Sequence, residues 1–236
     1  MKSKLKLCLI ILIGILFIAV GLLITFYPEI SNYFNTKNQS YAIQNYETYV
    51  AEIPVEEHIE EKNRADAYNE MLFEINNIRQ AKVKYLNKEN LFESYFSILN
   101  PNNDGIMAIV DIPKINVVLP VYHDTDGPEV SVAVGHIPYT SLPTGKVNTH
   151  MAICGHTALA TAKLFTDLDL LEIGDSFFLR VLQDKYEYCV DDIRIVDPDD
   201  YDCLNIVEGK EYVTLITCTP AGVGSHRLLV RGERVK

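Results

Sequence analysis

The chain has 236 residues, of which 48% are hydrophobic and 22% are charged. Its 32 acidic residues outnumber its 21 basic ones, so the net charge is −11. Proteins bind the phosphates of nucleic acid through lysine and arginine, so we expect no nucleic-acid partner for this acidic chain. With 14 tyrosines and nine phenylalanines it can bury a core, which excludes global disorder. The composition also excludes collagen-like, coiled-coil and disulfide-knot classes, and the length allows one medium domain with an appendage or two small domains.

An apolar block at residues 7–27 is the first feature along the chain. Its 21 residues carry no charge, and a helix of that length spans roughly 30 Å, the thickness of a bilayer core. Three lysines precede the block and the first acid, Glu29, follows it, which by the positive-inside rule places the N-terminus in the cytoplasm and the rest outside. A cleaved signal peptide is the alternative, but residues 24–28 offer no small-x-small cleavage site. We therefore expect an uncleaved, single-pass anchor in the cell membrane.

The chain beyond the anchor is acidic and contains four cysteines. Without the three lysines before the block, 18 basic residues face 32 acidic ones, a net charge of −14. Cys8 lies in the anchor, whereas Cys154, Cys189, Cys203 and Cys218 follow it. An extracellular domain can form disulfides, but the spacing matches no Cys-x-x-Cys metal or redox motif. The sequence leaves open whether these cysteines pair or stay free.

Residues 28–104 form a predicted helical lead before the main domain. Residues 28–55 link it to the anchor, with weak helical character from Tyr41 to Glu52 and an interruption at Pro54. Residues 55–78 are strongly helical, because apolar residues recur there at helical spacing. We expect this helix to pack on the main domain rather than on a partner protein.

Turn-forming residues from Asn100 to Gly105 end a polar, irregular stretch at 79–104 and mark a domain boundary. Residues 105–236 then alternate runs rich in Val, Ile, Tyr and Phe with Gly, Pro, Asn and Asp, a pattern typical of β-strands. We expect one short helix among them, near residues 160–171. Eight strands in about 130 residues favour a closed β-barrel over an α/β sheet, so the fold is predicted to be mainly β, with a helical N-terminal region and one transmembrane helix. The expected strands are Ile106–Ile112, Asn116–Tyr122, Val132–Gly135, His150–Cys154, Ser176–Leu182, Tyr186–Val196, Tyr212–Cys218 and His226–Glu233.

Thiol and imidazole groups are the candidates for chemistry, since the sequence has no phosphate-binding loop, dinucleotide fingerprint, His-Glu-x-x-His or Gly-x-Ser-x-Gly motif. Cys218 ends a predicted strand, where a substrate can reach it, and a thiolate nucleophile needs a nearby cation or base. His226 and Arg227 open the next strand, so a hairpin returns them beside Cys218, and strand alternation lets only one of them face the thiol. Alternatively, Cys218 is a small buried apolar residue. The other thiols and imidazoles of the domain are Cys154, Cys189, Cys203, His123, His136, His150 and His156.

His156 lies just beyond another predicted strand, after Gly155, which permits a sharp turn. Its imidazole titrates near neutral pH and would serve as a general acid or base. With His150 and Cys154 it would form part of a metal site, since even-numbered residues share a strand face, but the further ligands of such a site are not evident. A hydrogen-bonded surface histidine is the third interpretation. The residues alone do not decide which histidine acts, or whether Cys154 or Cys218 is the nucleophile.

A resemblance decides between these alternatives. Thr214–Cys218, Thr-Leu-Ile-Thr-Cys, resembles the Thr-Leu-x-Thr-Cys signature of sortases, the cysteine transpeptidases of Gram-positive cell surfaces. Further segments resemble class C, pilin-type sortases in order and spacing, and the resemblance covers about residues 105–235. These segments are Asp111–Ile115, Leu119–His123, Gly135–His136, Ser141–Gly145, Asn148–His150, Ala162–Asp169 and His226–Gly232.

The resemblance implies a sortase barrel at residues 105–236, behind an anchor at 1–27 and a helical lead at 28–104 that includes a candidate lid. It implies that Cys218 is the nucleophile, His156 the catalytic histidine and Arg227 the catalytic arginine, all at one rim and without metal or organic cofactor. The reaction implied is cleavage of a Leu-Pro-x-Thr-Gly-like sorting signal between Thr and Gly through a thioacyl-enzyme.

The partners implied are surface proteins or pilins that carry a sorting signal, and an amine acceptor. A pilin lysine is the expected acceptor, which makes the role pilus assembly. Attachment of single surface proteins to a peptidoglycan-precursor amine is the alternative. A non-enzymatic surface binding module on a β-barrel is the alternative from another class.

Overall fold

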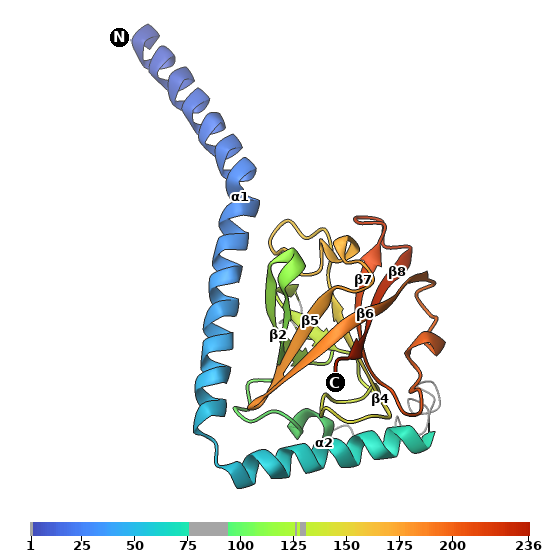
Figure 1. The fold of residues 1–236 in the computed structure, drawn as a ribbon. Helices are drawn as coiled ribbons and strands as arrows, with labels where there is room; N and C mark the ends of the chain where they lie inside the picture. The colour runs from blue at the N-terminus through green and yellow to red at the C-terminus, as the bar shows by residue number, and fades with distance from the viewer. Residues whose placement is uncertain (1, 76–93, 126, 128–130) are drawn as a thin grey trace.

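A β-barrel preceded by two long helices makes up the protein (Figure 1). The computed structural model describes residues 2–75, 94–125, 127 and 131–236. Helix α1 spans Lys2–Glu52 and helix α2 spans Val55–Ile75. Figure 1 shows α1 running along one side of the barrel, with its N-terminal part projecting beyond it, and α2 crossing the opposite end. Acidic residues in the first turn of α2 favour its start after Pro54, because they lie at the positive end of the helix dipole.

Helix α1 holds the apolar block and continues well beyond it. From Leu9 onwards it includes an 18-residue window with a mean hydropathy of 3.1, none of it buried inside the protein, so it is long and apolar enough to cross a membrane. The segment predicted to link the anchor to the domain, residues 28–55, continues this helix, which passes through Pro28 and reaches Glu52 unbroken. A proline removes only one N–H from the helix ladder, and no glycine or second proline follows before Pro54.

Eight strands of the described residues close the barrel in the order β1-β2-β3-β4-β7-β8-β6-β5, which confirms the predicted fold class. Two pairs are parallel, β2 with β3 and β4 with β7. Each predicted strand is present, with its ends shifted by at most two residues. The strands are β1 Ile106–Ile112, β2 Val117–His123, β3 Val134–His136, β4 Thr149–Gly155, β5 Ser176–Val181, β6 Asp184–Val196, β7 Glu211–Thr219 and β8 His226–Arg234, with 3₁₀ turns η1 at Pro113–Ile115 and η4 at Asp202–Leu204.

The predicted helix at residues 160–171 is wrong. Residues 156–167 form an irregular loop, which is followed by a single 3₁₀ turn, η3, at Leu168–Leu170. Leu164 has a φ of 39°, in the left-handed region that breaks a right-handed helix. The amide of Phe165, a fully buried residue, donates to the carbonyl of His156 at 3.1 Å. The apolar residues of this loop therefore pack into the barrel end and do not form a helical face.

The core fills the barrel and extends beneath α2. Every second residue of β5 is buried, as expected for a strand with one face toward the core. Asn69 on the buried face of α2 donates to the carbonyl of Leu142 at 2.8 Å and accepts from its amide at 2.7 Å. These contacts confirm that the predicted helix at 55–78 packs on the main domain as far as Ile75, while residues 76–78 lie outside the described residues.

The C-terminal part of α1 is attached to the barrel through Tyr46. Its hydroxyl donates to the carbonyl of Met107 at 3.2 Å and accepts from the amide of Leu182 at 2.9 Å. Val50, one turn further along the helix, and Ile53, just beyond its end, are buried as well. The phenol thus satisfies two backbone groups that burial separates from water, and it ties α1 to both β1 and the β5–β6 turn.

Tyr46→Phe keeps the ring and leaves the amide of Leu182 without its partner. We expect the free energy of unfolding to fall by about 1–3 kcal/mol, the cost of leaving a buried polar group unsatisfied. Urea unfolding of the full chain in detergent micelles, followed by circular dichroism, measures the change. Tyr41→Phe, at an exposed tyrosine of the same helix, is the matched control and should change the value by less than about 0.5 kcal/mol. Equal effects of the two substitutions would contradict the role assigned to Tyr46.

Candidate active site

The β7–β8 hairpin pairs Cys218 with Arg227. Residues directly opposite each other in antiparallel strands point to the same face of the sheet, so the thiol and the guanidinium share a face. The next pair, Thr219 with His226, points to the other face. Of the two basic residues at the start of β8, Arg227 is therefore the one that faces the thiol.

The turn between β7 and β8 lies over the Cys218 sulfur. The amides of Val223 and Gly224 both donate to the carbonyl of Pro220, at 3.0 and 2.9 Å. Gly224 has a φ of +70°, which favours glycine, and a Cβ atom built there would lie 3.9 Å from the sulfur. The turn thus brings polypeptide backbone close to the thiol.

The Arg227 side chain is half-buried and held by the same turn. Its Nη1 donates to the carbonyls of Gly224 at 3.0 Å and of His226 at 3.1 Å. Among the described residues, the basic groups of β8 that form ion pairs with carboxylates are His226, Arg231 and Arg234. The charge of Arg227 is therefore not neutralised by a carboxylate, and its remaining N–H groups are available to an acceptor beside the thiol.

His156 follows directly on β4, the parallel neighbour of β7. Cys154 pairs with Ile216 across these strands, and continuing that register by two residues brings His156 level with Cys218. The hydroxyl of Thr217 donates to the carbonyl of Gly155 at 2.7 Å and holds the end of β4 against β7. The sequence did not single out Thr217, although it belongs to the signature, because only the pairing of β4 with β7 supplies its partner.

Close packing at the end of β4 requires glycine at position 155. A Cβ atom there would approach Cγ1 of Val134 to 2.7 Å and Cδ2 of Phe165 to 2.8 Å, so only glycine fits. His156, one residue later, is exposed to solvent. Cys218, His156 and Arg227 therefore come from three separate segments of the chain to one end of the barrel, which we call the catalytic rim. The rim is defined by the ends of β4 and β7 and the start of β8.

Cys154 lies near the rim but in a different environment from Cys218. Burial, reinforced by the neighbouring Cys218 and partly offset by Arg227, raises the pKa of the Cys154 thiol to about 11. A thiol with that pKa stays protonated at neutral pH, and the protonated form is a poor nucleophile. Of the two thiols, Cys154 is therefore the one less suited to act as a nucleophile.

The remaining histidines are either buried away from the rim or directed away from the thiol. Burial lowers the pKa of His136 to about 3 and that of His150 to about 4, so both are neutral. His123 is also buried, with its two ring nitrogens near the carbonyls of Gly105 and Ile98 at 3.0 and 2.8 Å. His226 is exposed and lies 3.7 Å from a carboxylate oxygen of Asp197. These hydrogen bonds and the Asp197 contact give the four imidazoles structural roles.

The described residues contain no cluster of three or more His, Cys, Asp or Glu side chains that would hold a metal ion. The metal site considered for His150, Cys154 and His156 is therefore not assembled. Cys154, Cys189, Cys203 and Cys218 are all free thiols, which answers the question of pairing for these four. Of the candidate lid at 79–104, residues 79–93 lie outside the described residues.

Comparison with known proteins identifies the fold. A family model for the sortase domain matches residues 110–235, just over half of the chain. Sortase C1 from Streptococcus agalactiae superimposes with a TM-score of 0.74 and 40% identity, over 83% of this chain and 98% of that structure. Sortase C-1 from Actinomyces oris gives a TM-score of 0.59 and 46% identity over 61% and 81% of the two chains. Sortase C from Streptococcus pneumoniae gives a TM-score of 0.67 and 31% identity over 83% of this chain and 96% of that structure.

Relatives of known name give the same result at lower coverage. Sortase D from Bacillus subtilis is 30% identical over 138 residues, which is 57% of this chain and 67% of that protein. Sortase A from Bacillus anthracis is 30% identical over 132 residues, 55% and 60% of the two chains. The chain thus spans about two thirds or less of the length of these relatives. The resemblance carried by Thr214–Cys218 and its flanking segments is confirmed, and this chain belongs to the sortase family of cysteine transpeptidases.

Proposed function

We propose that this chain cleaves a Leu-Pro-x-Thr-Gly-like sorting signal between Thr and Gly and transfers the acyl part to an amine. Family membership supports acyl transfer by a cysteine. The observation that carries the residue assignment is the pairing of Cys218 with Arg227 across the hairpin, with His156 at the end of the neighbouring strand β4. We assign to Cys218 the role of nucleophile, to His156 that of general acid and base, and to Arg227 that of oxyanion or substrate ligand.

In the first half-reaction the Cys218 thiolate attacks the carbonyl carbon of the signal threonine. A C–S bond forms and the carbonyl oxygen takes up negative charge. Arg227 donates hydrogen bonds to that oxygen or to the substrate backbone, and its guanidinium is charged at any working pH. The absence of a carboxylate ion pair at Arg227 within the described part of β8 supports this role, because its charge is not already neutralised.

Collapse of this tetrahedral intermediate completes the first half-reaction, and attack by the acceptor amine on the thioester is the second. His156 protonates the glycine nitrogen as the C–N bond breaks, which releases the C-terminal peptide and leaves the thioester on Cys218. The acceptor amine then attacks the thioester, gives a proton to His156 and expels the Cys218 thiolate. The exposure of His156 supports this exchange of protons with substrates and solvent. These steps call for no metal and no organic cofactor.

The position of the apolar block supports a membrane-bound enzyme whose barrel lies outside the cell. Along α1, Asn35 contacts Thr161 in the loop after His156, whereas Tyr46 contacts the β5–β6 turn farther along the helix. The apolar segment therefore leaves the molecule on the side of the catalytic rim, as Figure 1 shows. In this arrangement the helix holds Cys218 close to the outer face of the membrane, where secreted proteins with sorting signals emerge.

A pilin lysine is the acceptor that we propose, and pilus assembly is therefore the role. The similarity to sortase C1 of Streptococcus agalactiae and to sortase C of Streptococcus pneumoniae, a structure described for its pilin substrate specificity, supports this choice. The second candidate is attachment of single surface proteins to a peptidoglycan-precursor amine. The chemistry at Cys218 is the same in both, so only the acceptor separates them.

Single substitutions test the assigned roles. We expect Cys218→Ala to abolish cleavage of a fluorogenic sorting-signal peptide, since no other thiolate replaces the nucleophile. His156→Ala and Arg227→Ala should each lower kcat/KM by about 10²- to 10⁴-fold, the range for losing a general acid or an oxyanion ligand. Cys154→Ala and His226→Ala are the controls and should stay within about threefold of the wild type. Loss of activity in Cys154→Ala alone would overturn the assignment.

The pH dependence of alkylation tests the contrast between the two thiols. Iodoacetamide reacts with thiolates, so a pKa raised to about 11 keeps Cys154 slow at pH 7 to 9, with a rate that rises as the pH approaches that value. Peptide mass spectrometry resolves the labelling of each cysteine over time. In urea-unfolded protein the cause of the shift is gone, and Cys154 should then react like an ordinary thiol. Rapid labelling of folded Cys154 at pH 7 would contradict the prediction.

The acceptor is identified by trapping and release of the acyl-enzyme. We expect incubation with a sorting-signal peptide to add its N-terminal acyl part to Cys218, visible as a mass increase that hydroxylamine removes. A lysine-bearing pilin peptide and an amine from a peptidoglycan precursor are then offered in equal amounts. An isopeptide bond to the lysine supports the pilus role, whereas transfer only to the precursor amine supports wall anchoring. Binding of the signal without any acyl-enzyme would instead support a non-enzymatic module.

A further inference from the structure

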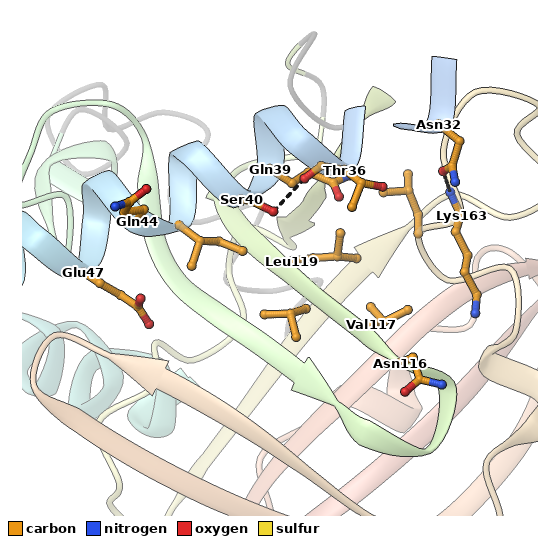
Figure 2. A pocket seen from close by; sticks show the side chains of 13 residues that line it. Asn32, Thr36, Gln39, Ser40, Gln44, Glu47, Asn116, Val117, Leu119 and Lys163 are labelled. Atoms are coloured by element: carbon orange, nitrogen blue, oxygen red, sulfur yellow. Dashed lines mark hydrogen bonds between the residues drawn. The ribbon is translucent and has the colours of Figure 1, made fainter. Parts of the chain in front are cut away.

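A groove runs beside helix α1 between its contacts near the rim and its contacts around Tyr46 (Figure 2). The groove has a volume of about 440 Å³ and lies between α1 and β2. Figure 2 shows Val117 and Leu119 on its floor and the polar side chains of α1 along its wall. Below it, Tyr46 anchors the helix to the barrel, as described above. Ala42 and Ile43 pack against the core along this stretch of the helix, whereas polar side chains make the contact on the rim side.

Three side-chain amides make the contact on the rim side. Asn35 donates through Nδ2 to the carbonyl of Thr161 at 2.8 Å, and Asn32 accepts through Oδ1 from the amide of Lys163 at 3.2 Å. Gln39 donates to the carbonyl of Val132. Positions 32, 35 and 39 are three and four residues apart, so the amides form one stripe on the helix face toward the barrel. All three bind backbone groups, which fixes the path of the chain rather than a particular side chain.

The backbone groups that these amides bind lie in the loop after His156 and next to the strand that pairs with the residue before it. Thr161 and Lys163 belong to the loop that begins at His156 and returns to it, where the amide of Phe165 donates to the His156 carbonyl at 3.1 Å. Val132 lies two residues before Val134, which pairs with Gly155 at the end of β4. Helix α1 therefore supports both the loop after His156 and the strand beside the residue before it.

The loop has few other polar attachments to the barrel. Lys163 donates through Nζ to the carbonyl of Ile115 at 2.9 Å and pairs with Asp167 at 2.8 Å within the loop itself. Residues 156–167 are irregular, so no helix ladder or sheet stiffens them. Catalysis requires reacting groups to be held within a fraction of an ångström, and rigid neighbours supply that precision for groups on loops. The amides of α1 therefore hold the loop at a stretch that neither a helix nor a sheet stiffens.

We propose that Asn32 and Asn35 of α1 are positioning residues for His156. They act through the loop at 156–167. They hold this loop against the part of α1 that follows the apolar segment. The inference rests on the proposed role of His156 as general acid and base. Under this proposal, helix α1 both anchors the chain and sets the orientation of His156.

Asn35→Ala in the full chain, in detergent micelles, tests the proposal, and Asn38→Ala is the matched control. Asn38 is the same residue type one turn away and is exposed. We expect Asn35→Ala to lower kcat for a sorting-signal peptide by about tenfold with little change in KM, because the substrate still binds while the proton donor is misplaced. The limb of the pH–rate profile that reports the histidine should shift as well. Asn38→Ala should change neither.

Asn35→Asp separates the hydrogen bond from the shape of the side chain. The carboxylate has the same size as the amide but cannot donate to the Thr161 carbonyl, so this variant should behave like Asn35→Ala. The thermal unfolding midpoint of each variant is measured alongside. A fall in kcat that only follows a loss of folded protein, with the pH–rate profile unchanged, overturns the proposal, as does an Asn35→Ala enzyme that matches Asn38→Ala.

His156→Ala, assayed in parallel, distinguishes failure of this inference from failure of the proposed function. If His156→Ala abolishes cleavage while Asn35→Ala matches its control, the role of His156 stands and the positioning by α1 is refuted. If His156→Ala keeps wild-type activity, the proposed role of His156 is itself refuted, and the positioning inference is refuted with it. A loss in both, with the shifted pH limb in Asn35→Ala, supports the two together.

Discussion

The register of β7 against its two neighbours is the constraint on which the candidate site depends. Antiparallel pairing with β8 sets Cys218 against Arg227, and parallel pairing with β4 brings the chain after Gly155 to the same rim. A slip of one residue in either pairing would turn the thiol to the opposite face of the sheet, because side chains alternate along a strand. Closure of the barrel opposes such a slip, since each strand is held on both sides. The geometry of the rim therefore follows from backbone pairing along the strands rather than from contacts between the candidate side chains.

Burial then separates groups of the same chemical type into different roles. His136 and His150 are kept neutral by the apolar interior and bind hydroxyl and carbonyl groups of the core. Cys154 is held as a thiol by the same effect, although it lies only two residues from His156. The exposed His156 and the half-buried Cys218 and Arg227 remain accessible at the rim. Burial thus argues against Cys154, His136 and His150 as catalytic groups, whereas strand alternation directs the exposed His226 away from the thiol.

Helix α1 connects this site to the apolar segment, which is long and apolar enough to cross a membrane. The helix is continuous from that segment to Glu52, so the barrel cannot swing freely relative to it as it would on a flexible linker. The amide contacts near the rim and the phenol of Tyr46 define two points along the helix, and two points fix its direction against the barrel. The part of the chain beyond the anchor carries a net charge of −14. An anionic lipid surface repels such an acidic domain. In the proposed topology, helix α1 must therefore hold the barrel near the membrane.

The sequence by itself determined the features that depend on local pattern. The apolar block, the eight strands and the helix at 55–75 follow from residue spacing, and Cys218 follows from the Thr214–Cys218 signature. Only the tertiary structure decided features that depend on distant partners. Pairing across the hairpin shows that Arg227 rather than His226 faces the thiol. Burial raises the pKa of the Cys154 thiol. Thr217 and Asn35 bind backbone groups far away in sequence. The helix predicted near residues 160–171 is absent, because the apolar residues of that segment are buried at the barrel end in an irregular path. A local pattern does not show which surface will cover a residue.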